Sequence, residues 1–402
     1  MPGRSLRVLI LGNTNNEPFR LGTELARLGC SVTLVPTSRG RLHDPRDLQA
    51  LPYFDDKRVE VLHRFRFAPQ LSWMVPRGVL RKGVLRLARD HDFAVLNGVA
   101  HSFGPALGIP WASMVTGADV IDYASLEWSS RPISRWARVE SKVTGADART
   151  IRQEFRYRQA LGLRHARFLI GAPRGASPDM DRVLRHVGAA DLPRLRFISR
   201  PSAAAMGLRA PAPRGLSPGT YTVLAPRLST RSVDTRIADM DDKGSEIALQ
   251  GWNLAVRSGY SGRLAVFRKG AHVKEIVGRC LSDDAGESVT WLDPMPYPDY
   301  VSLIANSRVV IESVGSSPVG RGAIEALSNG VPCISSSSSS VLEDRLGVRS
   351  RLHFTCGTPD EVAEALLHVG SIPSDLVQWV ADATGWSQSN SDAELILDRM
   401  RD

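Results

Sequence analysis

The sequence lacks the features of a membrane-spanning or disulfide-stabilised protein. No hydrophobic stretch approaches the ~20 consecutive apolar residues needed to cross a bilayer. The residues from Met1 to Ser5 lead straight into an apolar strand, without the apolar core of an export signal. The four cysteines form no C-x-x-C pair and lie far apart: Cys30, Cys280, Cys333 and Cys356. A disulfide framework or a zinc site is therefore not expected. We expect instead that the four cysteines are buried thiols in a reducing cytoplasm.

Aromatic residues are few, and acidic residues are outnumbered. Aromatics make up 6% of the chain, which argues against a large aromatic binding surface. The 51 Lys and Arg residues exceed the 42 Asp and Glu residues, for a formal charge of +9. Such an excess favours nucleotides, nucleic acid or anionic lipid as partners. Because neither a zinc finger nor an aromatic-interleaved RNA motif is present, no nucleic acid is expected.

The positive charge is concentrated in two segments. Residues 63–89 contain seven Arg or Lys and no acid, and residues 131–167 contain ten basic and three acidic residues. Solvated helix faces are the simplest interpretation of these segments. The alternative is a surface for an anionic membrane or a lipid-linked acceptor, which would place the protein peripherally at the inner face of the membrane.

The length and the pattern of apolar runs predict two α/β domains. A chain of 402 residues is too long for one ordinary core. Strand-like runs alternate with helix-length segments, as is typical of parallel βαβ units. In the first half the expected strands are Arg7–Leu11, Val32–Pro36, Val59–Leu62, Phe93–Leu96, Trp111–Val115, Phe168–Gly171 and Leu195–Ser199. In the second half they are Tyr221–Ala225, Leu264–Phe267, Val289–Leu292, Val309–Glu312 and Val331–Ser335.

A proline-rich segment separates the two halves. Its prolines and small residues over 201–219 are typical of an interdomain linker. We predict an N-terminal Rossmann-like domain over residues 1–200 and a C-terminal Rossmann-like domain over residues 220–380. Residues 381–402 are expected to form a C-terminal helix, with packing against the N-terminal domain as one option.

Two cations follow the first strand of the second half. Arg227 comes directly after Tyr221–Ala225, and Lys243-Gly244 opens the next helix. Because ligands of doubly wound folds bind at the carboxyl ends of the strands, these two side chains can converge on one pair of phosphate groups. Two solvated surface cations are the alternative.

A glycine-rich turn supplies a third element. Gly315, Gly320 and Gly322 lie between an expected strand and a helix that carries Glu325. Glycines let backbone amides approach an anion closely. Glu325 lies one turn into the helix and can accept hydrogen bonds from ribose hydroxyls, unless it is a solvated helix glutamate.

These residues resemble the nucleotide-binding half of glycosyltransferase family 4, whose members have the GT-B fold. The resemblance covers residues 220–340 well and the N-terminal half loosely. It rests on the Arg after the first strand, the Lys-Gly at the following helix and one long block. In this sequence the block is Pro318-Val319-Gly320-Arg321-Gly322-Ala323-Ile324-Glu325-Ala326-Leu327-Ser328-Asn329-Gly330-Val331-Pro332.

The resemblance implies roles for several of these residues. Arg227 and Lys243 would hold the diphosphate of a nucleotide-sugar donor, and Glu325 would bind the donor ribose. The segment Gly320-Arg321-Gly322 would contact phosphate or sugar. The resemblance further implies two facing Rossmann-like domains, a retaining reaction, and neither a metal nor another cofactor. The donor would be a UDP- or GDP-sugar.

The sequence departs from the family at two places. Ser317 stands eight residues before Glu325, where the family usually has a second glutamate that touches the donor sugar. Residues 228–242 also make a longer interval between the two cations than the family keeps. Arg236 in this interval is an alternative to Arg227 as the diphosphate ligand.

The first strand of the N-terminal half leads into an asparagine-rich loop. The loop is Gly12-Asn13-Thr14-Asn15-Asn16, and it does not have the G-x-G-x-x-G pattern, so a tightly bound dinucleotide is not expected. Resemblance to GT-B enzymes implies that Gly12, Asn13, Asn15 and Asn16 face the acceptor. An asparagine-rich turn is the alternative.

Two further strand ends of this half carry polar side chains. His101 follows the strand that ends at Leu96, and Thr116, Gly117 and Asp119 follow the strand that ends at Val115. Asp119 or His101 can orient or deprotonate an acceptor hydroxyl. Either side chain can equally cap the helix that follows it.

The sequence thus predicts a cytoplasmic glycosyltransferase that moves a sugar onto a glycan, a lipid-linked molecule or a small molecule. Many Arg, Ala, Gly and Pro residues suggest a bacterial source, with a role in envelope polysaccharide or natural-product glycoside synthesis. Three alternatives stay open: a non-catalytic GT-B-like protein that binds nucleotide or glycan, a sugar-nucleotide 2-epimerase, and a nucleic-acid binder.

Overall fold

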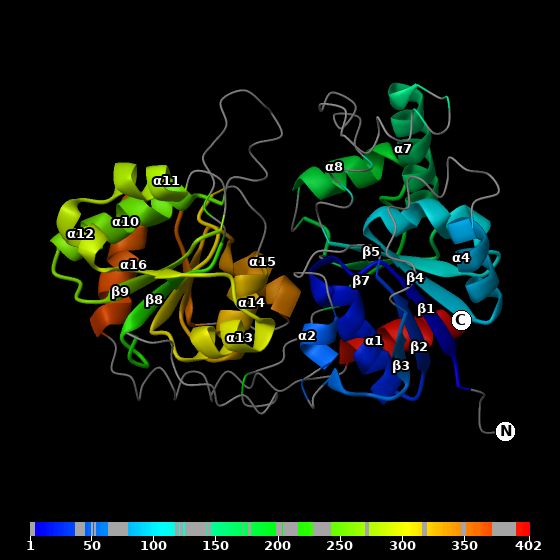
Figure 1. Cartoon of the computed structure of the whole chain (residues 1–402), viewed down its shortest axis with the longest axis horizontal. Coiled ribbons are helices and arrows are strands. Elements are labelled where there is room, and N and C mark those ends of the chain that lie inside the picture. The colour runs from blue at the N-terminus through cyan, green and yellow to red at the C-terminus, as the bar shows by residue number, and fades with distance from the viewer. Residues whose placement is uncertain are drawn as a thin grey trace. The chain divides into compact units, whose positions relative to one another are not determined.

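The chain forms two compact units in a computed structural model (Figure 1). The amino-terminal unit comprises Met1–Ala50, Phe54–Ser199 and Ser389–Asp402, and the carboxy-terminal unit comprises Leu51–Tyr53 and Arg200–Gln388. The structure describes residues 5–36, 45–49, 51, 54–62, 79–116, 120, 124, 142, 145, 147–171, 173–175, 178–197, 203, 216–226, 228, 243–269, 273–315, 320–346, 351–371 and 391–402.

A parallel sheet of seven strands forms the centre of the amino-terminal unit. Its order is β3-β2-β1-β4-β5-β6-β7, so the order reverses between β1 and β4. Its strands are β1 (Arg7–Leu11), β2 (Ser31–Val35), β3 (Val59–Val61), β4 (Phe93–Asn97), β5 (Trp111–Val115), β6 (Leu169–Gly171) and β7 (Arg194–Leu195). The inner strands are buried along almost their whole length, which explains why they occur in the sequence as continuous apolar runs.

Helices cover both faces of this sheet. They are η1 (Thr14–Asn16), α1 (Glu17–Arg27), α2 (Arg46–Gln49), α4 (Val79–Arg89), η5 (Gly98–Ala106), α7 (Ala148–Arg164), α8 (Pro178–His186) and α18 (Ser391–Arg401). Pro18 lies in the first turn of α1, and Gly29 follows its end with a φ of +94°. Between these signals Leu21 and Leu25 are spaced for one helix face, and both are fully buried.

The last helix of the chain, α18, belongs to the amino-terminal unit. It packs against α1 and β7 and buries Ala393, Ile396, Leu397 and Met400. Arg196, just after β7, donates to Asp392 at the start of the helix over 3.1 Å. The first and the last parts of the chain therefore share one core.

A parallel sheet of six strands forms the centre of the carboxy-terminal unit. Its order is β10-β9-β8-β11-β12-β13, with the reversal between β8 and β11. The strands are β8 (Tyr221–Leu224), β9 (Arg263–Phe267), β10 (Val289–Leu292), β11 (Val309–Ile311), β12 (Cys333–Ser335) and β13 (His353–Thr355). The edge strand β13 was not predicted, because it has only three residues and its burial falls from buried His353 to exposed Thr355.

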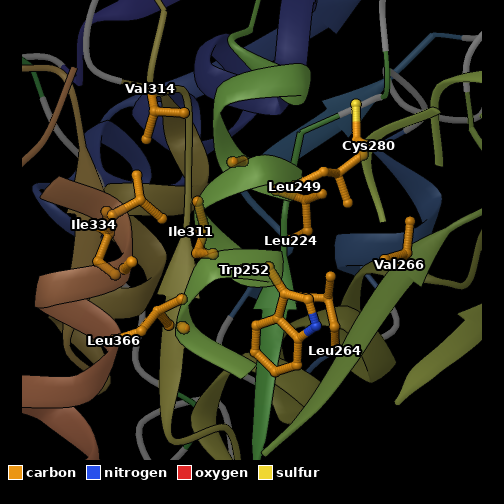
Figure 2. Close-up of a cluster of buried hydrophobic side chains, with 14 of the residues drawn as sticks. Leu224, Leu249, Trp252, Leu264, Val266, Cys280, Ile311, Val314, Ile334 and Leu366 are labelled. Atoms are coloured by element: carbon orange, nitrogen blue, oxygen red, sulfur yellow. The ribbon is translucent and has the colours of Figure 1, made fainter. Parts of the chain in front are cut away.

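The main core of this unit lies between the sheet and one layer of helices. Leu249 and Trp252 of α10 and Leu366 of α16 meet Leu264 and Ile311 of the sheet (Figure 2). The helices are α10 (Ser245–Arg257), α11 (Val273–Cys280), α12 (Asp283–Glu287), α13 (Tyr297–Ala305), α14 (Arg321–Ser328), α15 (Ser339–Leu346) and α16 (Pro359–Ser371). Helices α10, α11, α12 and α16 share this core, and α13 and α14 pack elsewhere against each other and the sheet (Figure 1).

The predicted fold class is confirmed, because both sheets are parallel, doubly wound and covered by helices. All four cysteines are buried and none is disulfide-bonded. Among the helices that the structure describes, none is both long and apolar enough to cross a membrane.

Candidate functional site

The switch point of the carboxy-terminal unit brings Lys243 beside the segment that follows β11. The amide of Val314 donates to the carbonyl oxygen of Lys243 over 3.2 Å. Gly244 has a φ of +65°, and a Cβ added there would overlap the backbone of Val314 and Gly315. Only glycine allows this approach, so the helix that starts at Ser245 is placed directly against the segment after β11. In doubly wound sheets, ligands bind outside the carboxyl ends of the strands at such a point.

Glu312 directly follows β11 and carries a buried carboxylate at the same place. Its side chain accepts from the amide of Ser313 over 2.6 Å, and the residue is 6% exposed. A Cβ added to Gly320 would overlap this carboxylate, so Gly320 also lies against it. Burial raises the pKa of Glu312, while the amides of Ser313 and Gly320 and the ammonium of Lys243 act to lower it.

The serine run after β12 supports the segment that follows β11. The amide of Ser336 donates to the carbonyl oxygen of Ser313 over 2.9 Å, and its hydroxyl donates to the carbonyl oxygen of Gly315. The hydroxyl of Ser335 is hydrogen-bonded to Nε2 of His353 on β13, at 2.9 Å. Burial lowers the pKa of His353 to about 4, so this imidazole is neutral at pH 7.

Glu325 is a buried, hydrogen-bonded carboxylate on α14. It is 3% exposed, which excludes the interpretation as a solvated helix glutamate. Its Oε1 accepts from the hydroxyl of Tyr297 over 2.8 Å and from Nε of Arg321 over 3.1 Å. Both donors hold the carboxylate in one orientation, as a residue that receives hydroxyl hydrogen bonds requires.

In the amino-terminal unit the asparagine loop bonds mainly to itself and to α1. Asn13 is 2% exposed, donates to Oδ1 of Asn16 over 2.5 Å and accepts from the amide of Phe19 over 3.0 Å. Gly12 has a φ of +95°, and an added Cβ would overlap the carbonyl of Asn97. These contacts favour the interpretation of the loop as a rigid turn that starts α1.

Asn97 at the end of β4 connects three strand ends. Its Oδ1 accepts from the amide of Thr14 over 2.7 Å. Its Nδ2 donates to the carbonyl of Met114 over 3.0 Å and lies 3.4 Å from the hydroxyl of Thr116. The predicted residues Gly12, Asn13, Asn16 and Thr116 are thereby brought to one place, the switch point between β1 and β4.

His101 lies inside the amino-terminal unit. It belongs to η5 and is 0% exposed. Its carbonyl oxygen lies against Gly162 of α7 so closely that a Cβ at that glycine would overlap it. Trp111 donates to the carbonyl of the same glycine over 2.9 Å. The close packing favours a structural role for His101 over contact with an acceptor.

Several predicted site residues lie outside the part of the chain that the structure describes. These are Arg227 with its alternative Arg236, Ser317, Gly117 and Asp119, together with the side chain of Asn15. Among the described residues the structure groups Lys243 with Gly320 around Glu312, and Gly322 lies next to Ala225 and Glu312. No group of three or more metal-ligating side chains occurs in that part.

Three residues of the site were missed by the sequence analysis: Glu312, Tyr297 and Ser336. A signal for Glu312 was available, because an acidic residue directly after a buried strand at a switch point is unusual. Tyr297 contacts Glu325 from another helix, so only the fold brings the two together. Ser336 lies in a run whose six serines look equivalent in the sequence.

Comparisons with known proteins identify the fold of the chain. No family model matches the sequence, and no curated protein matches it. The structure is similar to that of HepE from Anabaena, determined in complex with UDP and glucose, with a TM-score of 0.60 and 16% identity over 98% of this chain and 99% of that one.

Two further solved structures cover nearly the whole chain. Sucrose-phosphate synthase from Thermosynechococcus elongatus has a TM-score of 0.53 and 12% identity over 97% of this chain and 94% of that one. UDP-N-acetylglucosamine 2-epimerase from Rickettsia bellii has a TM-score of 0.51 and 12% identity over 99% and 96%. With two parallel Rossmann-like units and these structural neighbours, the chain has the GT-B fold of glycosyltransferases.

Proposed function

We propose that the protein is a glycosyltransferase that binds a nucleotide-diphosphate sugar at the β8–β11 switch point of the carboxy-terminal unit. The observation that supports this most is the close placement of Lys243, the backbone of 313–315 and Glu312, with Gly320 at the start of α14. HepE, of similar fold, was solved with UDP and glucose, so UDP is the first nucleotide to test and GDP the alternative.

The chemistry of sugar transfer explains why these residue types are needed. The leaving diphosphate gains negative charge, and preorganised cations and amides stabilise it most when water is excluded. Lys243 supplies a cation, with Arg227 or Arg236 as the second. Glu325 binds the ribose hydroxyls, held by Tyr297 and Arg321. The reaction retains configuration and uses no metal, and the resemblance assigns Gly322 and Ser317 to binding of the donor sugar.

The acceptor binds the amino-terminal unit at the β1–β4 switch point. The resemblance assigns Gly12, Asn13, Asn15 and Asn16 to this acceptor site, together with Thr116 and Gly117. Asp119 is the first candidate for the group that receives the proton of the acceptor hydroxyl. His101 ranks behind it because the imidazole is completely buried.

The acceptor is a glycan, a lipid-linked molecule or a small molecule, in bacterial envelope polysaccharide or natural-product synthesis, and the protein acts in the cytoplasm. The basic segments favour peripheral association with an anionic membrane. On α4 the described side chains of Lys82, Arg86 and Arg89 are exposed, and α4 carries no acid. Sedimentation with phosphatidylglycerol vesicles, absent with phosphatidylcholine and lost at high salt, would support this surface. Equal binding to both lipids would contradict it.

A thermal-shift screen without metal tests the donor site. UDP, GDP, ADP, TDP and CMP are compared on the unchanged chain, on Lys243→Ala and on Lys82→Ala as a matched control. We expect one diphosphate to raise the melting temperature. Loss of the Lys243 charge should weaken the binding of that nucleotide about a hundredfold, since removing one partner of a charge pair costs about 2–5 kcal/mol. Lys82→Ala has no effect.

The outcomes separate the candidate functions. No shift with any nucleotide at millimolar concentration would reject the donor site. A shift without release of nucleotide from a UDP-sugar, with or without acceptor, would favour a non-catalytic binding protein.

A sugar-nucleotide 2-epimerase is the second candidate, because the fold is also similar to that of an epimerase. Proton NMR of UDP-N-acetylglucosamine with the protein distinguishes the two. A new 2-epimer signal would support epimerisation, and an unchanged spectrum with acceptor-dependent UDP release would support transfer.

A further inference from the structure

A buried carboxylate lies where the sequence predicted a binding site for anions. Glu312 is 6% exposed and directly follows β11, beside Lys243 and the start of α14. A negative charge here opposes the binding of a diphosphate. A buried charge is also costly unless it is paired. Hydrophobic packing does not explain why a carboxylate occupies this position.

The carboxylate contacts both ends of the segment that joins β11 to α14. At the first end Oε2 accepts from the amide of Ser313 over 2.6 Å. At the other end Gly320 lies against both carboxylate oxygens, and a side chain there would overlap them. The aliphatic part of Glu312 lies next to Gly322 in the first turn of α14. One side chain thus fixes where the segment begins and where it ends.

The same carboxylate acts on the cation of the site. The ammonium of Lys243 interacts electrostatically with Glu312. The backbone carbonyl of Lys243 accepts a hydrogen bond from the amide of Val314, two residues after Glu312. Glu312 therefore interacts with Lys243, which follows β8, and with both ends of the segment that follows β11. A neutral or shorter side chain at this position could not make all of these interactions.

We propose that Glu312 is a positioning residue, which holds residues 313–315, Gly320 and Lys243 in the geometry that binds the donor diphosphate. This inference rests on the proposed function, since it assumes that the diphosphate binds at the β8–β11 switch point. Glu312 itself does not contact the donor. Its negative charge opposes the diphosphate, and the preorganised amides and ammonium more than offset this cost.

Two substitutions distinguish positioning from simple electrostatics, and the two explanations differ in sign. In Glu312→Gln the shape is kept, but the new amide group meets two backbone N–H donors and can accept from only one side. In Glu312→Asp the charge is kept, but the side chain is one methylene too short to reach both ends. If Glu312 were only a nearby negative charge, Gln would strengthen the binding of an anion and Asp would leave it unchanged.

The experiment is a ³¹P NMR titration of the full chain with inorganic pyrophosphate, a probe that needs no nucleotide base. We expect both variants to bind pyrophosphate about tenfold more weakly, the factor for one lost hydrogen bond to a charged group. Glu361→Gln is the matched control, because this carboxylate also accepts from two backbone amides of the same unit, those of Gly357 and Thr358, and it should bind as the unchanged chain does. Far-UV circular dichroism checks that each variant is folded.

Tighter binding by Glu312→Gln, or unchanged binding by both variants, would overturn the positioning role and leave the donor site intact. If Glu312→Gln does not fold, Glu312→Asp decides alone: tenfold weaker binding supports the proposal, and unchanged binding overturns it. Failure of the unchanged chain to bind pyrophosphate, while Lys243→Ala behaves the same, would reject the diphosphate site and this inference with it.

Discussion

The two units share an architecture but differ in charge. The amino-terminal unit contains 33 Lys and Arg against 22 Asp and Glu, an excess of 11 positive charges, and the carboxy-terminal unit contains 18 against 20. The excess charge of the chain therefore lies in the unit to which we assign the acceptor. The unit to which we assign the anionic donor is close to neutral. Donor binding must then depend on local arrangement, while the acceptor unit attracts anions through its general field.

The polar residues at the two switch points differ in the same way. In the amino-terminal unit Asn13, Asn16 and Asn97 are uncharged and bond mostly to backbone and to each other. In the carboxy-terminal unit the corresponding place holds Lys243, Glu312 and Glu325, which are charged and partly paired. One switch point thus consists of uncharged groups that are hydrogen-bonded to one another, and the other holds charged groups close together.

The rigidity of the amino-terminal switch point can be broken at Gly12. Gly12→Ala should destabilise this unit by about 3–4 kcal/mol, because it adds left-handed strain and overlap with the Asn97 carbonyl. Gly29→Ala is the control, since its φ of +94° is nearly the same and nothing lies within 4 Å of an added Cβ. It should cost about 1 kcal/mol. Hydrogen exchange of peptides from each unit measures both effects, and equal losses would show that the close approach is unimportant.

In acid the carboxy-terminal unit should lose stability through His353. Burial holds its pKa at about 4 in the folded chain, below the ordinary histidine value of 6.5. The unfolded chain therefore binds the proton first, so the contribution is fully present above pH 6.5 and is lost as the pH falls toward 4. Between pH 7 and pH 4.5 the loss is about 2.5 kcal/mol. Urea unfolding at the two pH values should give a smaller difference for His353→Gln, and an equal difference would contradict the assignment.

Asn97 allows a matched comparison of one residue type in the two units. Asn97→Ala should cost about 2 kcal/mol, because it leaves the amide of Thr14 and the carbonyl of Met114 without this partner in a buried place. Asn253→Ala in the carboxy-terminal unit removes two bonds to Ser282 that are exposed. It should cost about 0.5 kcal/mol, since water can replace the amide. Urea denaturation compares the variants, and a larger effect at Asn253 would reverse the comparison.

The smallest expected effect concerns the orientation of Glu325. Tyr297→Phe should weaken the binding of the nucleoside diphosphate identified in the thermal-shift screen about fivefold. This factor corresponds to ~1 kcal/mol for one hydrogen bond. The 2′,3′-dideoxy form of the same nucleotide should bind both proteins equally. Tyr221→Phe, which loses a hydrogen bond to Leu303 in the same unit, is the control. Isothermal titration calorimetry measures the affinities, and equal weakening of both nucleotide forms would exclude an effect through the ribose.

The sequence was sufficient for the fold because buried parallel strands occur as continuous apolar runs. The strands at Arg7–Leu11 and Val289–Leu292 have the predicted bounds. By contrast, the predicted strand Leu195–Ser199 is described only as Arg194–Leu195. The pattern gave no indication of β13, in which His353 is buried and Thr355 exposed without a long apolar run.

The site was less accessible from the sequence, because its contacts join distant residues. Lys243 and Glu325 were found through local motifs. Glu325 accepts a hydrogen bond from Tyr297 of another helix, and the contact of Glu312 with Gly320 requires the return of the chain from β11 to α14. Similarly, the position of His101 after a strand predicts an accessible side chain, but in the fold Gly162 of α7 packs against this residue. Local spacing identifies which residues can act, and the fold decides which of them are already engaged.

The return of α18 to the amino-terminal unit has a consequence for synthesis. The core beside α1 is completed by Ile396, Leu397 and Met400, which are made after every strand of both sheets. Domains generally fold as they leave the ribosome, in order from the N-terminus. Here the α1 face stays uncovered until α18 has emerged. The unit that is translated first is thus the last to be completed.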